Sequence, residues 1–295
     1  MKTVRSLIHV VLLIAVSPSA LAVVSVGSLN YPVWAERGEQ RVPLAPGDRL
    51  QTGDVVQTGA NGRVWLQVEG GNAIKLGQGA RFAIERADLR GSGDDATLRA
   101  TFNLLQGAFR FTSRFFELQP QVRHELVFKV GAVKLRADGR DLWGRSADEA
   151  DFLVLLEGRA EVTPAGQSAI LMDKPSTVFR KMQGLPAEPV TSISPAKVED
   201  LVAQTELEPS LGIARMTGNY VLVLQSLSSD ALVEAELDRL RQAGYAVQAR
   251  VVDVNGKSYT RIQLEGLAYR AAAQNLRRRM IDAGLIEDAW IGLAE

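Results

Sequence analysis

The 295-residue chain balances 34 lysines and arginines against 34 aspartates and glutamates, and it has two histidines and no cysteine. A balanced charge gives no general attraction to nucleic acid. Disulfides and Cys-ligated zinc sites are excluded, and only His124 lies beyond the N-terminal apolar segment, so a triad or metal site that needs two histidines is excluded as well.

The N-terminus has the pattern of a secretory signal. Two basic residues, Lys2 and Arg5, precede an apolar run over 7–16, and small residues follow up to Ala22. This order predicts a cleavable signal peptide over residues 1–22. A retained membrane anchor is the alternative, but a membrane span needs roughly 20 apolar residues and this run is shorter. We therefore expect export, with no membrane span after cleavage.

Residues 27–185 have the pattern of an all-β domain. Short runs that alternate apolar and polar residues, such as Arg63–Val68, are separated by turns rich in Gly, Asp and Asn. Period-two alternation with frequent turn residues favours strands. Three turn aspartates, at 48, 54 and 138, could in principle bind Ca²⁺, but they lack a regular ligand spacing and are better explained as turn caps. No metal site is expected.

Several segments of this region resemble FecR domains. The string LAPGDRLQTGD over Leu44–Asp54 resembles the opening of that family, and Leu104–Phe111, Phe128–Gly139 and Leu153–Val162 resemble its later hallmarks. A departure occurs at Ala137-Asp138-Gly139, where the family commonly has a Gly-Thr pair. The resemblance implies a periplasmic β domain. FecR regulators relay signals through a cytoplasmic tail and a span; neither is recognisable here, so we expect a second binding or sensing module instead.

A linker is predicted over residues 186–218. Prolines at 186, 189, 195 and 209 interrupt regular structure. Between them, residues 195–205 have helical spacing with Pro195 in the first turn, which predicts a short helix. This helix could cap one domain or bridge the two.

The C-terminal region, 219–295, contains one motif written twice. Each copy has a strand-like run, a helix-like run that ends at an Ala-Gly pair, and a second strand-like run; the copies begin at Tyr220 and Tyr259. A glycine just past a helix adopts the left-handed conformation that ends it. Two such copies predict an α+β domain of βαββαβ order, with two helices on one face of an antiparallel sheet. The fold class is thus multi-domain, all-β followed by α+β.

This duplicated unit resembles the SPOR domain. Leu222–Leu227 (LVLQSL) stands where the family's first strand reads roughly Val-Gln-Val-Gly-Ser-Phe, and Thr260–Leu267 (TRIQLEGL) stands where it has Tyr-Arg-Val-Arg-Val-Gly-Pro-Phe. Ala243-Gly244-Tyr245 matches its usual helix end. The resemblance implies binding to septal peptidoglycan, with preference for glycan strands that lack stem peptides.

Strand alternation sorts the two faces of the expected sheet. Leu222, Leu224, Ile262 and Leu264 are expected to pack on the helices, together with Val247, Ala249 and Val251. Amide and guanidinium groups on the other face suit sugar hydroxyls and acetamido groups, and an aromatic ring provides stacking. The candidate glycan-binding residues are Gln225, Gln248, Arg250, Tyr259, Arg261, Gln263 and Trp290. Val223, Gln225 and Glu265 depart from the family pattern.

Three other functions remain as alternatives. A βαββαβ fold also serves RNA recognition, but the two central strands lack the aromatic residues that stack on bases, and export argues against RNA. A peptidoglycan-remodelling enzyme would need paired carboxylates, zinc ligands or an activated nucleophile in a recognisable string. A scaffold whose FecR-like domain binds a protein partner is the third. We expect a non-catalytic periplasmic protein of a Gram-negative envelope that binds peptidoglycan and needs no cofactor.

Overall fold

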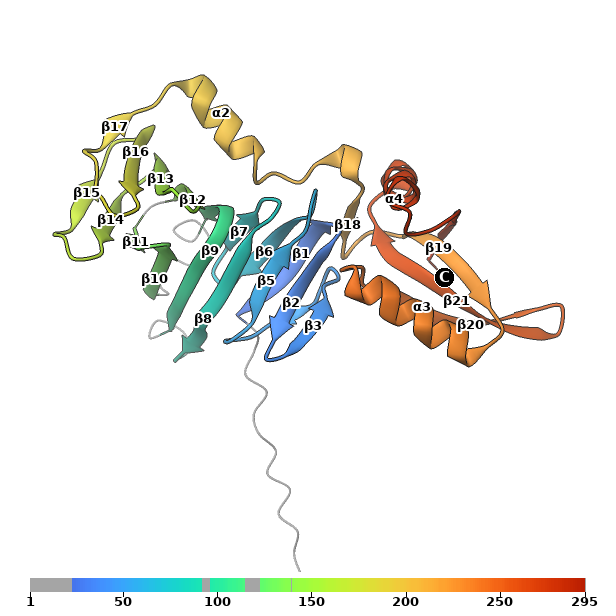
Figure 1. Ribbon diagram of the computed structural model, residues 1–295. Helices are drawn as coiled ribbons and strands as arrows, with labels where there is room; N and C mark the ends of the chain where they lie inside the picture. The colour runs from blue at the N-terminus through green and yellow to red at the C-terminus, as the bar shows by residue number, and fades with distance from the viewer. Residues whose placement is uncertain (1–22, 92–95, 115–122, 139, 295) are drawn as a thin grey trace, which may run out of the picture.

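The computed structural model describes residues 23–91, 96–114, 123–138 and 140–294. The expected signal peptide, 1–22, lies outside the described residues. Two β-rich halves lie side by side, joined by a long connection that carries helix α2 (Pro195–Ala203) (Figure 1). Within the described ranges, no helix has the length and apolar character needed to cross a bilayer.

The N-terminal half contains two sheets that share one long strand. Strand β9 (Thr97–Ser113) belongs to both and changes sheets near Gly107, whose φ of 88° suits glycine. The first sheet contains, in order, β17 (Thr191–Ser192), β16 (Thr177–Met182), β13 (Ala150–Glu157), β12 (Asp141–Ser146), β9, β7 (Asn72–Leu76), β6 (Arg63–Val68) and β1 (Val24–Asn30). The second contains β15 (Ile170–Met172), β14 (Ala160–Pro164), β11 (Val133–Ala137), β10 (Arg123–Val130), β9, β8 (Arg81–Arg90), β5 (Val55–Thr58), β2 (Val33–Arg37) and β3 (Gln40–Pro43).

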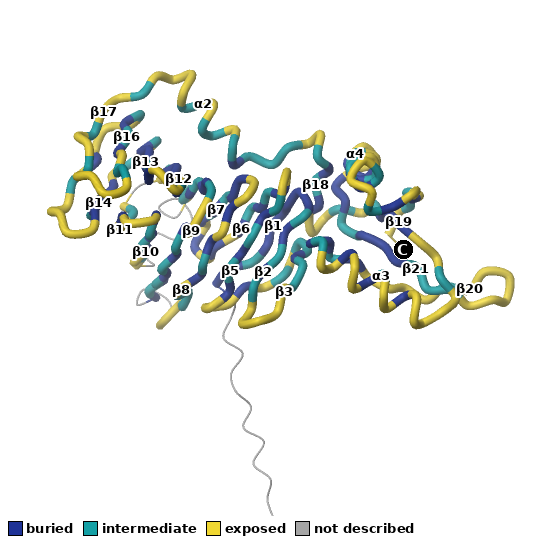
Figure 2. The backbone as a smooth tube through the Cα atoms, in the orientation of Figure 1, coloured by how far each residue is buried: buried dark blue, intermediate teal, exposed yellow. Residues whose placement is uncertain are grey.

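The core of this half lies between the two sheets. Alternate residues of the strands are buried, as period-two patterning requires (Figure 2). Aromatic rings link the sheets, with ring centroids 5.2 Å apart for Phe109 and Phe128 and 5.0 Å apart for Phe111 and Phe128. The described part of this half is therefore all-β, as the sequence pattern predicts.

The C-terminal half has the predicted βαββαβ order. Its elements are β19 (Tyr220–Leu227), α3 (Asp230–Gln242), β20 (Gln248–Val254), β21 (Lys257–Leu267), α4 (Arg270–Asp282) and β22 (Trp290–Leu293). The sheet order is β22–β19–β21–β20. Both helices pack on one face through buried residues such as Leu237 and Leu276, and Gly244 and Gly284 end them with positive φ.

One packing expectation for this half is wrong. Ala249 is exposed and Val251 is 72% exposed, although Val247 is buried. Strand β20 and the first residues of β21 extend beyond the helices as a hairpin (Figures 1 and 2). The alternation of β20 is thus real, but no helix reaches far enough to cover its apolar side.

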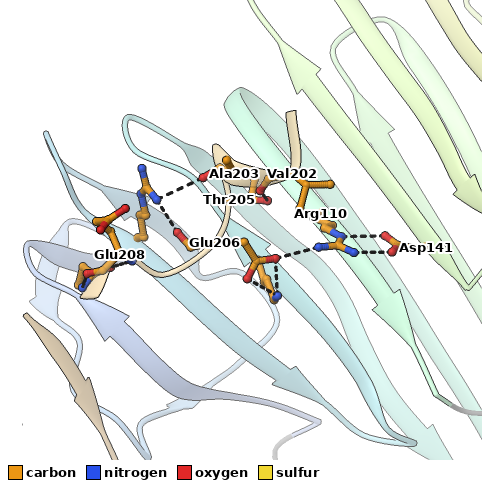
Figure 3. A network of polar contacts seen from close by, with 10 residues as sticks. Arg110, Asp141, Val202, Ala203, Thr205, Glu206 and Glu208 are labelled. Carbon is orange, nitrogen blue, oxygen red and sulfur yellow. Dashed lines mark hydrogen bonds and ion pairs between the residues drawn. The ribbon is translucent and has the colours of Figure 1, made fainter. Parts of the chain in front are cut away.

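The connecting segment runs along the first sheet. We call residues 203–212, which include the 3₁₀ turn η2 (Pro209–Leu211), the strap. The Glu206 carboxylate accepts hydrogen bonds from Lys75 Nζ, at 2.6 Å to each oxygen, and from Arg110 Nη1 at 2.8 Å (Figure 3). Arg110 also binds Asp141, at 2.5 and 2.9 Å. The linker is thus an ordered part of the molecule, held by charged side chains of the β domain.

The strap is followed by a strand that joins the two halves. Strand β18 (Ile213–Arg215) pairs with β1 on one side and with β21 on the other. The two halves therefore share one continuous sheet. Further contacts surround this joint: Tyr31 stacks on Tyr245 at 5.6 Å, and the backbone N–H of Val33 donates to the carbonyl of Gly244 at 3.1 Å.

Candidate functional site

The register of the C-terminal sheet determines which candidate residues share a face. Directly opposite residues point to the same side. Gln248 lies opposite Gln263, Gln263 opposite Val223, and Val223 opposite Trp290. In the next two rows, Arg250 lies opposite Arg261 and Val252 opposite Tyr259. We call this side, away from the helices, the open face; it brings together Gln248, Arg250, Tyr259, Arg261, Gln263 and Trp290.

Gln225 does not belong to the open face. Val223 pairs with Gln263 and Gln225 pairs with Ile262, so Leu224 is an extra residue in the ladder. Such a bulge shifts the alternation of a strand by one position. Ser226, opposite Arg261, takes the place on the open face that the sequence pattern assigns to Gln225. Gln225 is exposed on the other side.

Gln263 lies on the open face but is buried, contrary to the expectation of an exposed amide. Only 4% of it is exposed, and its Nε2 donates to Glu265 Oε1 at 2.7 Å. Its neighbour Val223 is also buried, at 2%. Both features follow from the residues at 223 and 265 that differ from the family pattern. The Glu265 carboxylate accepts the hydrogen bond from the Gln263 amide, and the Val223 side chain fills the position opposite Gln263. Gln263 therefore supports its neighbours more than it offers a donor to solvent.

Arg261 and Trp290 form the centre of the open face. The Arg261 guanidinium carbon lies 4.9 Å from the centroid of the Trp290 ring, which is the geometry of a cation–π contact. A Cβ atom added at Gly292 would lie 3.2 Å from Trp290 Cζ3, so the ring rests against the glycine backbone. Trp290 remains 48% exposed. The result is a fixed aromatic ring with a guanidinium at its side.

The remaining members surround this pair. Gln248 and Arg250 are exposed on β20, and Tyr259 is half-buried on β21. Glu265 is the carboxylate on the same side of β21, and it is engaged with Gln263. The open face thus offers two aromatic rings, guanidinium groups and an amide on a rigid sheet. These groups are suited to binding neutral hydroxyl and amide ligands.

His124 lies far from the open face, in β10 of the N-terminal half. Its Nδ1 is 3.5 Å from Asn72 Nδ2, and burial lowers its pKa to about 4. In the described ranges, no cluster of three or more His, Asp or Glu side chains is placed to hold a metal ion.

This pKa predicts a pH effect on stability. Between about pH 6.5 and pH 4, His124 takes up a proton in the unfolded chain but not in the folded one, so the folded state loses stability as the pH falls. The loss should reach about 2 kcal/mol. Urea unfolding of the wild type and His124→Gln at pH 7.5 and 4.5 measures it. An equal loss in both proteins would contradict the assignment to His124.

The C-terminal half thus belongs to the class of βαββαβ domains whose helices leave one sheet face uncovered. Within that class, residues 217–287 match the family model of the SPOR domain. The C-terminal half is therefore a SPOR domain, which is a non-catalytic binding domain whose presence suggests peptidoglycan binding. The match to the family model covers only residues 217–287 of the chain.

Solved structures offer weaker likenesses. Two crystal structures of a putative anti-sigma factor from Parabacteroides distasonis share 11% and 9% sequence identity with this chain. The match to the first structure spans 78% of this chain and 91% of the other chain, with a TM-score of 0.39. The match to the second spans 69% of this chain and 96% of the other chain, with a TM-score of 0.40. No curated protein matches the sequence.

Proposed function

We propose that this protein is an exported, non-catalytic component of a Gram-negative envelope that binds the glycan strands of peptidoglycan through the open face. The observation that supports this most is the Arg261–Trp290 pair. A ring held against Gly292 stacks on a sugar at little cost in conformational entropy, because its position is already fixed. The neighbouring guanidinium groups donate to hydroxyl and acetamido oxygens.

The proposed site has a smaller polar set than the sequence pattern predicts. Gln248, Arg250 and Arg261 supply the donors, Trp290 and Tyr259 supply rings, and Gln263 supports the sheet beneath them. Gln225 lies on the opposite side and has no role in the proposed site. The preference for glycan without stem peptides, which the resemblance implies, belongs to the same proposal, since a long stem peptide would crowd a flat face.

The other parts of the proposal follow from the sequence. The pattern over 1–22 supports export through a cleaved signal peptide. The N-terminal β half is proposed as a FecR-like domain with its own binding or sensing role, on the motifs quoted above. A protein partner for that half remains the competing account of where specificity resides.

Sedimentation with peptidoglycan sacculi tests the proposal. We expect the wild-type chain to co-sediment, and the double substitution Arg261→Ala with Trp290→Ala to weaken binding by at least about tenfold, or ~1.4 kcal/mol. The matched control is Arg241→Ala with Tyr269→Ala, which removes an exposed arginine and an aromatic ring at the ends of the two helices. Equal binding by the two double variants, with both still folded by circular dichroism, would refute the site.

A further inference from the structure

We propose that the N-terminal β domain carries a second subsite for the same glycan strand, in a hollow on the outer face of the first sheet. The hollow has a volume of about 560 Å³ and is lined by residues of β1, β6, β7 and β9, including Trp65, Gln67 and Thr112. This inference rests on the proposed function, because it extends the ligand of the open face onto the β domain.

The hollow and the open face lie on the same side of one continuous sheet. Leu29 of β1 lies opposite Ala214 of β18, which lies opposite Leu267 of β21, and all three are fully buried. At one end of this row the Leu29 side chain faces the core of the β domain, and at the other end the Leu267 side chain faces the side of the sheet that carries α3 and α4. The outer face of β1 and β6 must then continue into the open face, because each strand has only two sides.

Small residues create the hollow. One row of the sheet reads Ser25, Gln67, Ala73 and Thr112 across β1, β6, β7 and β9. Ser25 and Ala73 leave space between the longer side chains. The turn after β6 adds Gly70 and Gly71, which have φ of 78° and 75° and carry no side chain. The floor is therefore backbone, with Trp65 in the neighbouring row.

The chemistry of the hollow suits a neutral, hydroxyl-rich ligand. Trp65 is half-buried and offers part of its ring, and Gln67 is exposed and offers an amide. The Gln67 side chain lies over Gly27, because a Cβ at that glycine would be 3.1 Å from Gln67 Cγ. The one lysine in the lining, Lys75, is neutralised by Glu206. Of the other charged residues, Glu69 and Arg114 have opposite signs.

The two sites are too far apart for a single sugar. The path from β6 to β21 crosses β1 and β18, and three strand spacings of ~4.8 Å make roughly 15 Å. A glycan strand long enough to reach both sites gains affinity from the second contact, because that contact is intramolecular. A short fragment gains nothing. Dependence on ligand length is therefore the signature of the second subsite.

Titration of the full chain with glycan fragments of two lengths tests this inference. The probes are a purified denuded disaccharide, which is too short to reach both sites, and denuded strands of many repeats, measured by calorimetry. Gln67→Ala removes a donor, and Ala73→Leu fills the hollow without touching the core. Each is expected to weaken binding of long strands on the order of tenfold and to leave disaccharide affinity unchanged. Gln183→Ala, an exposed glutamine after β16, is the control and should change neither.

The outcomes separate the two proposals. Arg261→Ala with Trp290→Ala should weaken both ligands. If that variant does so while Gln67→Ala and Ala73→Leu leave long-strand affinity unchanged, the second subsite is wrong and the open face stands. Equal losses for both ligand lengths in the hollow variants would also overturn a separate subsite. If the wild-type chain binds neither probe, the proposed function itself fails.

Discussion

Asn30→Ala is expected to lower the free energy of unfolding by about 3 kcal/mol. Asn30 is fully buried at the joint of the two halves. Its Nδ2 donates to the carbonyls of Glu208 and Gly212 at 3.1 and 3.0 Å, and its Oδ1 accepts the N–H of Glu208 at 2.9 Å. Alanine would leave these strap groups without their partners, and each unsatisfied buried group costs about 1–3 kcal/mol.

Urea unfolding followed by tryptophan fluorescence measures this loss. The control is Asn103→Ala, which removes one exposed hydrogen bond, from Asn103 Nδ2 to Glu85 at 2.9 Å. It should cost well under 1 kcal/mol, because water replaces the lost partner. Limited proteolysis should also cut the strap faster in Asn30→Ala. A cost no larger than that of Asn103→Ala would show that the strap does not depend on this residue.

Arg110→Ala is expected to cost about 2–3 kcal/mol. Arg110 links Asp141 of β12 to Glu206 of the strap, and its side chain and that of Asp141 are each only 18% exposed (Figure 3). The hydrogen bond from Arg110 to Asp141 raises the pKa of the guanidinium, with a further contribution from the charge of Glu206. Removal of the Arg110 side chain would leave the carboxylates of Asp141 and Glu206 without the guanidinium that they share, while Lys75 stays paired with Glu206.

Calorimetry measures this effect as a shift of the unfolding temperature. A cost of 2–3 kcal/mol corresponds to a decrease of roughly 4–10 °C in a chain of this size. Arg99→Ala is the control, because Arg99 pairs with Glu125 at 2.8 Å on the surface, where such a pair contributes little. Decreases of similar size in the two variants would mean that the strap network contributes no more than a surface ion pair.

Much of the C-terminal half is predictable from local pattern. The repeat of strand, helix and strand, with Gly244 and Gly284 at the helix ends, depends on periods of 2 and 3.6 residues that each segment shows by itself. The same alternation places Arg261, Arg250 and Gln248 on one side, as the register of the sheet does. The density of turns in the N-terminal half likewise predicts its strands.

Features that depend on distant contacts were not predictable. The bulge at Leu224 is a property of the pairing between β19 and β21, and nothing in LVLQSL marks it. Simple alternation therefore places Gln225 on the wrong face. Burial of Gln263 depends on Val223, which lies opposite it on the neighbouring strand and is itself buried. Strand β18 is three residues long, too short for a pattern, yet it joins the two halves. The anchoring role of Asn30 lies in contacts 178 and 182 residues away.

The fixed joint has a consequence for function. Because β1, β18 and β21 belong to one sheet, the open face has a set orientation relative to the β domain. A flexible tether would let the SPOR domain search for glycan independently. Here a bound glycan strand would orient the β domain as well, and any ligand of that domain would be presented at a constant position relative to the wall.

Site-specific photo-crosslinking to denuded glycan strands tests the central claim most directly. A photoreactive residue at Val252 lies on the open face opposite Tyr259, whereas one at the adjacent Val251 lies on the other side of the same strand. Val251 is the more exposed of the two, at 72%, so exposure alone would favour adducts from position 251. We predict glycan adducts from position 252 and few or none from position 251. Adducts mainly from position 251, or none from either while the chain still binds sacculi, would contradict binding through the open face.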